Sequence, residues 1–173
     1  MSTLQERARR AYEWARLRRA LVASIPVAAL VTVSMLLVTR PDRAGLVGVA
    51  VVLVGVWSLW RGVGLPQAFA AGVTSGLVPL LAVSAAMKAP HACAAGLCIS
   101  VCLPAAGAGG LVAGVLLGLW QRRFSPSRRQ LALGFAVMVL TGAMACACIG
   151  LTGVAILLLT GGATLLLTLR RAS

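Results

Sequence analysis

Acidic residues are nearly absent from this sequence. Its 173 residues include three of them, Glu6, Glu13 and Asp42, against sixteen Lys and Arg. None of the three lies inside an apolar run, so a chain of carboxylates that relays protons through a membrane is not expected. Charged residues of both signs make up 11% of the chain, which is too few to cover a water-soluble fold.

Residues that catalyse reactions are also scarce. The chain has one histidine, His91, and the sequence contains no phosphate-binding loop and no dinucleotide-binding fingerprint. We therefore do not expect an enzyme. The sixteen basic residues fall in short clusters between apolar runs, so they predict membrane topology and not direct binding of nucleic acid.

Apolar residues dominate what remains. They form 60% of the chain, and the mean hydropathy is +0.98, which predicts an all-α integral membrane protein. Crossing about 30 Å of hydrocarbon takes roughly 20 helical residues. The apolar runs predict six transmembrane helices in a membrane domain over 20–169, with spans of about 20–39, 44–60, 65–87, 102–120, 131–149 and 151–169. The last two share one uncharged run, which is too long for a single crossing.

The basic residues predict the orientation of these spans. With six crossings, thirteen of the sixteen share the side of both termini, and the other three are Arg40, Arg43 and Lys88. Because cytoplasmic loops are enriched in Lys and Arg, this distribution predicts that both termini are inside the cell, with 170–173 as a cytoplasmic tail. We expect a multi-pass protein of a bacterial inner membrane.

The N-terminal segment, 1–19, is expected to be a basic amphipathic helix in the cytoplasm. It has six arginines, and a stripe of mostly small apolar residues recurs at helical spacing, namely Leu4, Ala8, Ala11, Tyr12 and Ala15. Such a helix can lie on the lipid bilayer, held by anionic headgroups and aromatic side chains. It can also be a docking helix for a cytoplasmic partner. The sequence leaves both interpretations open.

Glycines recur in the fourth span. Gly110, Gly114 and Gly118 are four residues apart, so they share one helix face. Small residues at this spacing let two helices approach closely in lipid. The sequence predicts close packing on this face.

The five cysteines form the candidate site for a ligand or a redox reaction. Under the six-span topology they all fall at the outer face, near His91. Candidate redox or metal-sensing residues are His91, Cys93, Cys98, Cys102, Cys146 and Cys148. Buried thiols are often packing residues, which is the first interpretation.

Two chemical interpretations stand beside packing. In one, a disulfide joins Cys98 or Cys102 to Cys146 or Cys148, and an odd count leaves a thiol over. In the other, thiolates and imidazole bind a soft metal ion such as Cu(I), Zn(II) or Hg(II), with His91, Cys98, Cys102 and Cys148 as candidate ligands. The spacings do not match a zinc-knuckle signature. No cofactor is certain.

The second half of the chain resembles membrane-embedded anti-sigma factors of the negative-regulator-of-sigma-F type. The residues that carry the resemblance are Cys98, Cys102 and Pro104, the arginine-rich loop from Arg122, and Cys146 or Cys148. Asp42, in the RPD that follows the first span, is also similar, but the arginine-rich N-terminus departs from the family, where an acidic or polar one is common. The resemblance implies a regulator that holds an extracytoplasmic-function sigma factor and responds to oxidant or metal stress through outer-face cysteines.

The partner surface that this resemblance implies lies at the inner face. Its candidate residues are Leu4, Arg7, Ala8, Ala11, Tyr12, Ala15, Arg122, Arg123, Arg128 and Arg129. Two other functions remain open: a soft-metal transporter or metal-binding membrane protein, and a quinone-linked thiol oxidoreductase. An oxidoreductase usually has two cysteines separated by two residues, and no pair in this chain has that spacing.

Overall fold

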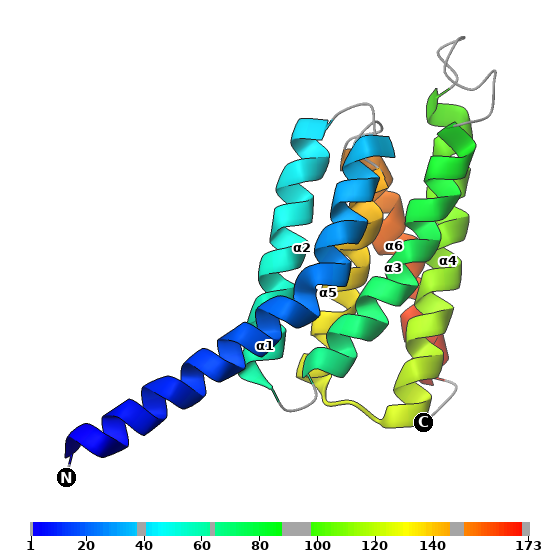
Figure 1. Cartoon of the computed structure of the whole chain (residues 1–173). Helices are drawn as coiled ribbons and strands as arrows, with labels where there is room; N and C mark the ends of the chain where they lie inside the picture. Colours follow the sequence, from blue (N-terminus) through cyan, green and yellow to red (C-terminus); the bar gives the residue numbers. More distant parts are fainter. Residues whose placement is uncertain (1, 38–40, 63–64, 88–97, 146–150, 171–173) are drawn as a thin grey trace.

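The described residues of this computed structural model, 2–37, 41–62, 65–87, 98–145 and 151–170, are helical apart from short connections. Their six helices are α1 (Ser2–Leu37), α2 (Pro41–Arg61), α3 (Leu65–Met87), α4 (Cys98–Phe124), α5 (Arg128–Ala145) and α6 (Leu151–Arg170). The all-α fold with six helices is as predicted. Figure 1 shows them as a bundle from which one half of α1 projects.

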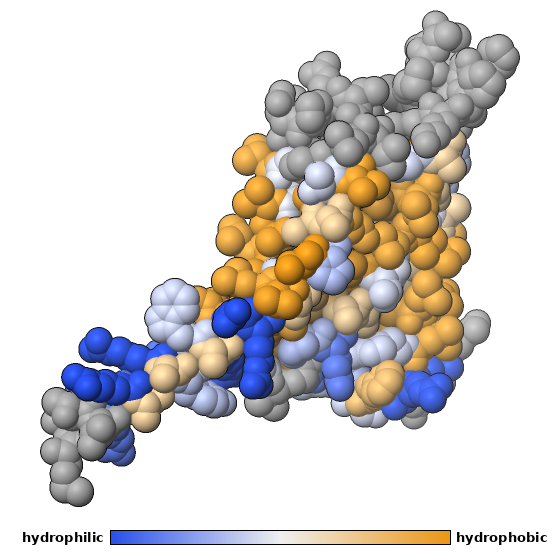
Figure 2. Space-filling model, viewed as in Figure 1, coloured by the Kyte–Doolittle hydropathy of each residue, from blue (hydrophilic) through white to orange (hydrophobic). Residues whose placement is uncertain are grey.

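Three stretches are long and apolar enough to cross a membrane. They are Leu65–Ala86, Cys102–Phe124 and Leu151–Arg170, and a shorter apolar stretch covers Gly45–Arg61. Apolar side chains cover the wall of the bundle in Figure 2, whereas hydrophilic residues gather on the projecting part of α1 and along the lower edge. These features indicate a membrane protein.

The N-terminal segment and the first predicted span form one helix. α1 runs from Ser2 to Leu37 with no break at Arg19 and Ala20, where the basic segment meets the apolar run. Figure 1 shows α1 changing direction near the bundle, and Pro26 lies inside it. A proline removes one helical hydrogen bond and commonly causes such a bend. The arm of α1, residues 5–19, is therefore a direct helical extension of the part that packs on α2.

Glycines set the spacing between α3 and α5. A Cβ atom on Gly76 would lie 2.7 Å from the Cβ of Thr141 and 2.8 Å from the carbonyl oxygen of Met138. Gly72, four residues earlier, approaches the carbonyl oxygen of Gly134 as closely. Two backbones can come this near only where side chains are missing. α3 and α5 are consequently the most extensively packed pair.

The glycine face predicted on α4 packs against α6. A Cβ on Gly110, Gly114 or Gly118 would collide with the hydroxyl of Thr160, Thr164 or Thr168 respectively. Each of these hydroxyls donates to a carbonyl of its own helix, as in the 2.8 Å bond from Thr164 to Thr160. The polar atoms are thus satisfied within α6, and close packing is confirmed. The threonine face opposite the glycines was not anticipated.

α3 lies among the other helices. Half of its apolar stretch is buried, against 22% for α6. Its Pro79 is fully buried between α4 and α5, because Gly109 approaches its Cα and Gly142 approaches its ring. α4 packs mainly on α6 and α3 and touches α5 much less, at contacts such as Leu117 with Gly134. The expected pairing of α4 with α5 is therefore only a minor contact, and α3 is the neighbour that they share.

Candidate functional site

Basic residues converge at one end of the bundle. Contacts there join the end of α2 to the arm, the end of α4 to the end of α6, and the α4–α5 connection to the start of α3. The helices therefore alternate in direction. The described basic residues of this end, which we call the basic end, are Arg61, Arg122, Arg123, Arg128, Arg129 and Arg170, together with the arginines of the arm.

The α4–α5 connection is held by local hydrogen bonds. Ser127 begins α5 as a capping box, in which its backbone N–H donates to Gln130 Oε1 at 2.8 Å and its hydroxyl accepts from the Gln130 N–H at 3.4 Å. Ser125 has a positive φ of 44° and donates its N–H to Gln121 at 2.8 Å. Arg122 Nη2 donates to the carbonyl oxygen of Thr168 at 3.0 Å. All four arginines predicted to bind a partner are exposed here.

The arm of α1 is the most exposed helical segment of the basic end. Residues 5–15 are all exposed, and Tyr12 and Trp14 keep 68% and 71% of their surfaces accessible. Within it, Arg9 Nε donates to Glu13 Oε1 at 3.2 Å. Large aromatic side chains at such exposure require either lipid or another protein to cover them.

Helical periodicity separates two faces of the arm. The bundle-facing positions of α1 are marked by buried Ala20, Ser24 and Val31, and 3.6 residues per turn extends this face to Leu17 and Glu13. Ala8, Ala11 and Ala15 fall on the opposite side, and all are exposed. The predicted partner stripe therefore faces away from the bundle in the part that the structure describes, which does not include the Leu4 side chain.

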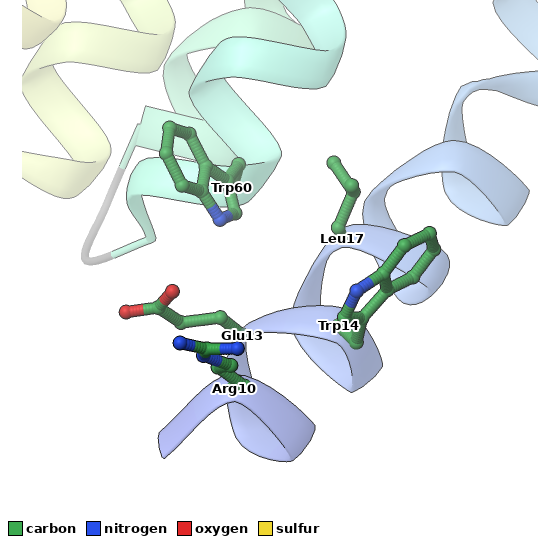
Figure 3. Close-up of a pocket in the computed structure, with 5 residues that line it drawn as sticks. All are labelled: Arg10, Glu13, Trp14, Leu17 and Trp60. Carbon is green, nitrogen blue, oxygen red and sulfur yellow. The ribbon is translucent and has the colours of Figure 1, made fainter. Parts of the chain in front are cut away.

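A notch separates the bundle-facing side of the arm from the end of α2. It measures about 400 Å³ and is lined by Arg10, Glu13, Trp14, Leu17 and Trp60. Figure 3 shows the Trp60 indole from α2 on one side and the four arm residues on the other. Sequence reasoning assigned Trp60 to the membrane interface and did not connect it with the arm. Helical spacing of Arg10, Glu13 and Leu17 was the signal that was available.

The end of α2 fixes where the arm leaves the bundle. Gly62 has a positive φ of 71° and donates its N–H to Ser58 at 3.2 Å, which ends the helix. The Arg16 guanidinium lies so close to Gly62 that it would collide with a Cβ atom there. The Arg61 guanidinium lies 5.5 Å from the centre of the Trp57 ring, a cation–π contact. The arm is thus seated on α2 at one level.

One of the predicted thiols lies among the residues whose side chains are described. Cys102 is 1% exposed and belongs to an apolar cluster with residues such as Val83, Ala106 and Met144. An oxidant or a metal ion would reach it only after the surrounding helices part, since reactive thiols are usually partly exposed. Cys98 begins α4, but its side chain, together with His91, Cys93, Cys146 and Cys148, lies outside the described residues. The disulfide and the metal site stay predictions.

Comparison with known proteins found no counterpart: no family model, no curated protein and no solved structure matches the chain.

Proposed function

We propose that this protein is a regulator of a bacterial inner membrane that crosses the bilayer six times and holds a cytoplasmic protein at its basic end. Both termini lie in the cytoplasm. The partner implied by the resemblance in the second half of the chain is a sigma factor of the extracytoplasmic-function class. In this proposal the protein is an anti-sigma factor.

The observation that carries the proposal is the exposure of the arm. Ala8, Ala11 and Ala15 form a narrow apolar strip, with Arg7 and Arg18 on one side and Arg19 on the other. The strip faces away from α2, so no described element of the chain covers it. A strip of this kind suits an acidic partner helix, because small side chains permit close approach and guanidinium groups bind carboxylates in pairs.

The arginines around Ser125 extend the same surface. Arg122, Arg123, Arg128 and Arg129 flank a connection that is held by the Ser127 capping box, so their backbone is fixed before a partner arrives. Rigid presentation lowers the entropy lost on binding. Positively charged surfaces also speed the encounter with an acidic protein. Together the arm and this connection offer a two-part docking surface.

The stimulus would act at the opposite end of the bundle, where α4 begins at Cys98. Oxidation of outer-face thiols, or their binding of a soft metal ion, would change how the helices pack there. Since α4 packs on α3 and α6, such a change reaches helices whose other ends lie at the basic end. A two-state bundle of this kind links thiol chemistry on one side to partner release on the other.

Capture from the host membrane tests the proposal. The full chain, tagged after Ser173, is purified in mild detergent, and proteins that copurify are identified by mass spectrometry. We expect a sigma factor with wild type and its loss when residues 2–16 are deleted, while insertion persists because Arg18, Arg19 and the other inner arginines remain. Absence of any sigma factor from the wild-type sample would exclude the anti-sigma function.

A second measurement separates the regulator from the soft-metal transporter. In cells exposed to copper, mercury or zinc salts, a regulator changes transcription of its target genes and leaves the metal content of the cell unchanged. Uptake that depends on Cys102 or Cys148, with no transcriptional effect, would instead identify a transporter.

A further inference from the structure

The notch between the arm and α2 has the composition of a binding site for a charged and partly apolar molecule. One guanidinium (Arg10), one carboxylate (Glu13) and two indoles (Trp14 and Trp60) border it, and Leu17 supplies an aliphatic wall. Its volume of about 400 Å³ is in the range of small-molecule sites. The notch is open on one side, so an occupant enters without unfolding either helix.

An exposed apolar track leads to this notch along α2. Leu46, Val49, Leu53 and Trp57 recur at intervals of three or four residues, so they share the face of Trp60. Their exposed fractions run from 45% to 76%. Leu21, one turn beyond Leu17 on α1, is 49% exposed. In a bilayer this track contacts hydrocarbon chains, and the notch lies where the track meets the basic end, at the level of lipid headgroups.

Both signs of charge are present at that level. A guanidinium such as Arg10 donates several hydrogen bonds in a plane and suits a phosphate. Glu13 is one of three acids in the whole chain, and its carboxylate lies in the notch beside Trp60. A carboxylate accepts hydrogen bonds from a primary ammonium, and the face of an indole attracts the same cation.

We propose that the notch binds the headgroup of an aminophospholipid, with its phosphate on Arg10, its primary ammonium between Glu13 and Trp60, and its acyl chains along the α2 track. An anionic glycerol headgroup places no cation against Glu13. A choline headgroup has no N–H to donate to the carboxylate. The carboxylate therefore makes ethanolamine the headgroup that fits. This site is independent of the sigma-factor proposal, since it uses the opposite face of the arm.

Native mass spectrometry of the full chain tests the site. The protein is reconstituted in nanodiscs that contain equal amounts of phosphatidylethanolamine, phosphatidylglycerol and phosphatidylcholine, and the lipids retained after ejection are weighed. We expect one phosphatidylethanolamine to be retained in preference to the other two lipids. Glu13→Gln should reduce this preference roughly tenfold, the effect of losing one hydrogen bond between charged groups. Arg10→Gln should weaken retention of all three, because they share the phosphate.

Three matched controls accompany these variants. Glu6→Gln and Arg7→Gln change the same charges on the arm outside the notch, and Trp57→Leu is the counterpart of Trp60→Leu. The controls should retain phosphatidylethanolamine as wild type does, and Trp60→Leu should not. Preference for phosphatidylglycerol, or equal losses from Glu13→Gln and Glu6→Gln, would overturn the assignment. Size-exclusion chromatography confirms that each variant is folded, so a lost lipid is not mistaken for a lost fold.

Discussion

Gly114 of α4 lies against Thr164 of α6 so closely that a Cβ atom on the glycine would collide with the threonine hydroxyl and lie 2.6 Å from the carbonyl oxygen of Gly161. Neither backbone atom nor hydroxyl can yield cheaply, because the hydroxyl is bonded to Thr160 at 2.8 Å. The distance between these two helices is therefore set by the absence of a single methyl group. This contact is the midpoint of a row that runs from Gly110 to Gly118.

Adding that methyl group should separate the helices. We expect Gly114→Ala to destabilise the bundle by about 1–3 kcal/mol, the usual range for overpacking. Gly107→Ala is the control, because a Cβ there would be 3.6 Å from Ile156, an ordinary contact. The control should unfold no earlier than wild type, since alanine also has the better helix propensity. Circular dichroism of detergent-solubilised protein on heating measures both. Equal midpoints for the two variants would contradict this account of the interface.

The topology is tested with reporters at two positions. A reporter that is active only in the cytoplasm should work after Ser173, and one that is active only outside should work when inserted at Ala89. The physical reason is the concentration of thirteen of the sixteen basic residues at one end. Activity of both fusions in the same compartment would require an odd number of crossings between the two positions to be replaced by an even one, and the six-span proposal would fail.

The docking face of the arm is tested by a charge placed within it. Ala11→Glu adds a carboxylate to the outward strip and should lower capture of an acidic partner at least several-fold, because like charges directly opposed are unfavourable. Gln5→Glu makes the same change of charge on the arm and should have a smaller effect. The measurement is the amount of copurified partner per tagged chain. If both variants capture equally, net charge matters and the strip does not.

The burial of Cys102 predicts its reactivity. A variant that keeps this cysteine alone should be alkylated by a maleimide only after denaturation, because the side chain is 1% exposed. The positive control is Arg123→Cys in a cysteine-free chain, an exposed position at the basic end. Mass spectrometry counts the labels. Rapid labelling of Cys102 in the native protein would mean that α4 and its neighbours open readily.

The helices themselves were readable from the sequence because their apolar runs are long and are separated by charge, proline or glycine. The span predicted over 65–87 is α3 with the same bounds. Pro41, expected to stop the preceding helix, also begins α2, which suits a residue whose missing N–H costs nothing in a first turn. The predicted glycine face of α4 is likewise a packing face.

The order in which the helices pack was not readable. In lipid a helix is apolar on every side, so hydropathy does not mark the face that meets a neighbour. Short connections suggested that α4 would pair with α5, yet the threonines of α6 and the buried Pro79 of α3 are the main partners of α4. The notch was missed for a related reason. It joins Glu13 and Trp60, two residues that are distant in sequence and belong to different helices.

The continuity of α1 has a mechanical consequence. Its 36 residues span about 54 Å along the helix axis, and the described helix has no loop that could absorb torsion between the apolar half and the arm. Because the helix is bent, rotation of the apolar half about its own axis swings the arm sideways like a crank. A small twist among the packed helices is thereby converted into a large sweep of Tyr12 and the alanines beside it.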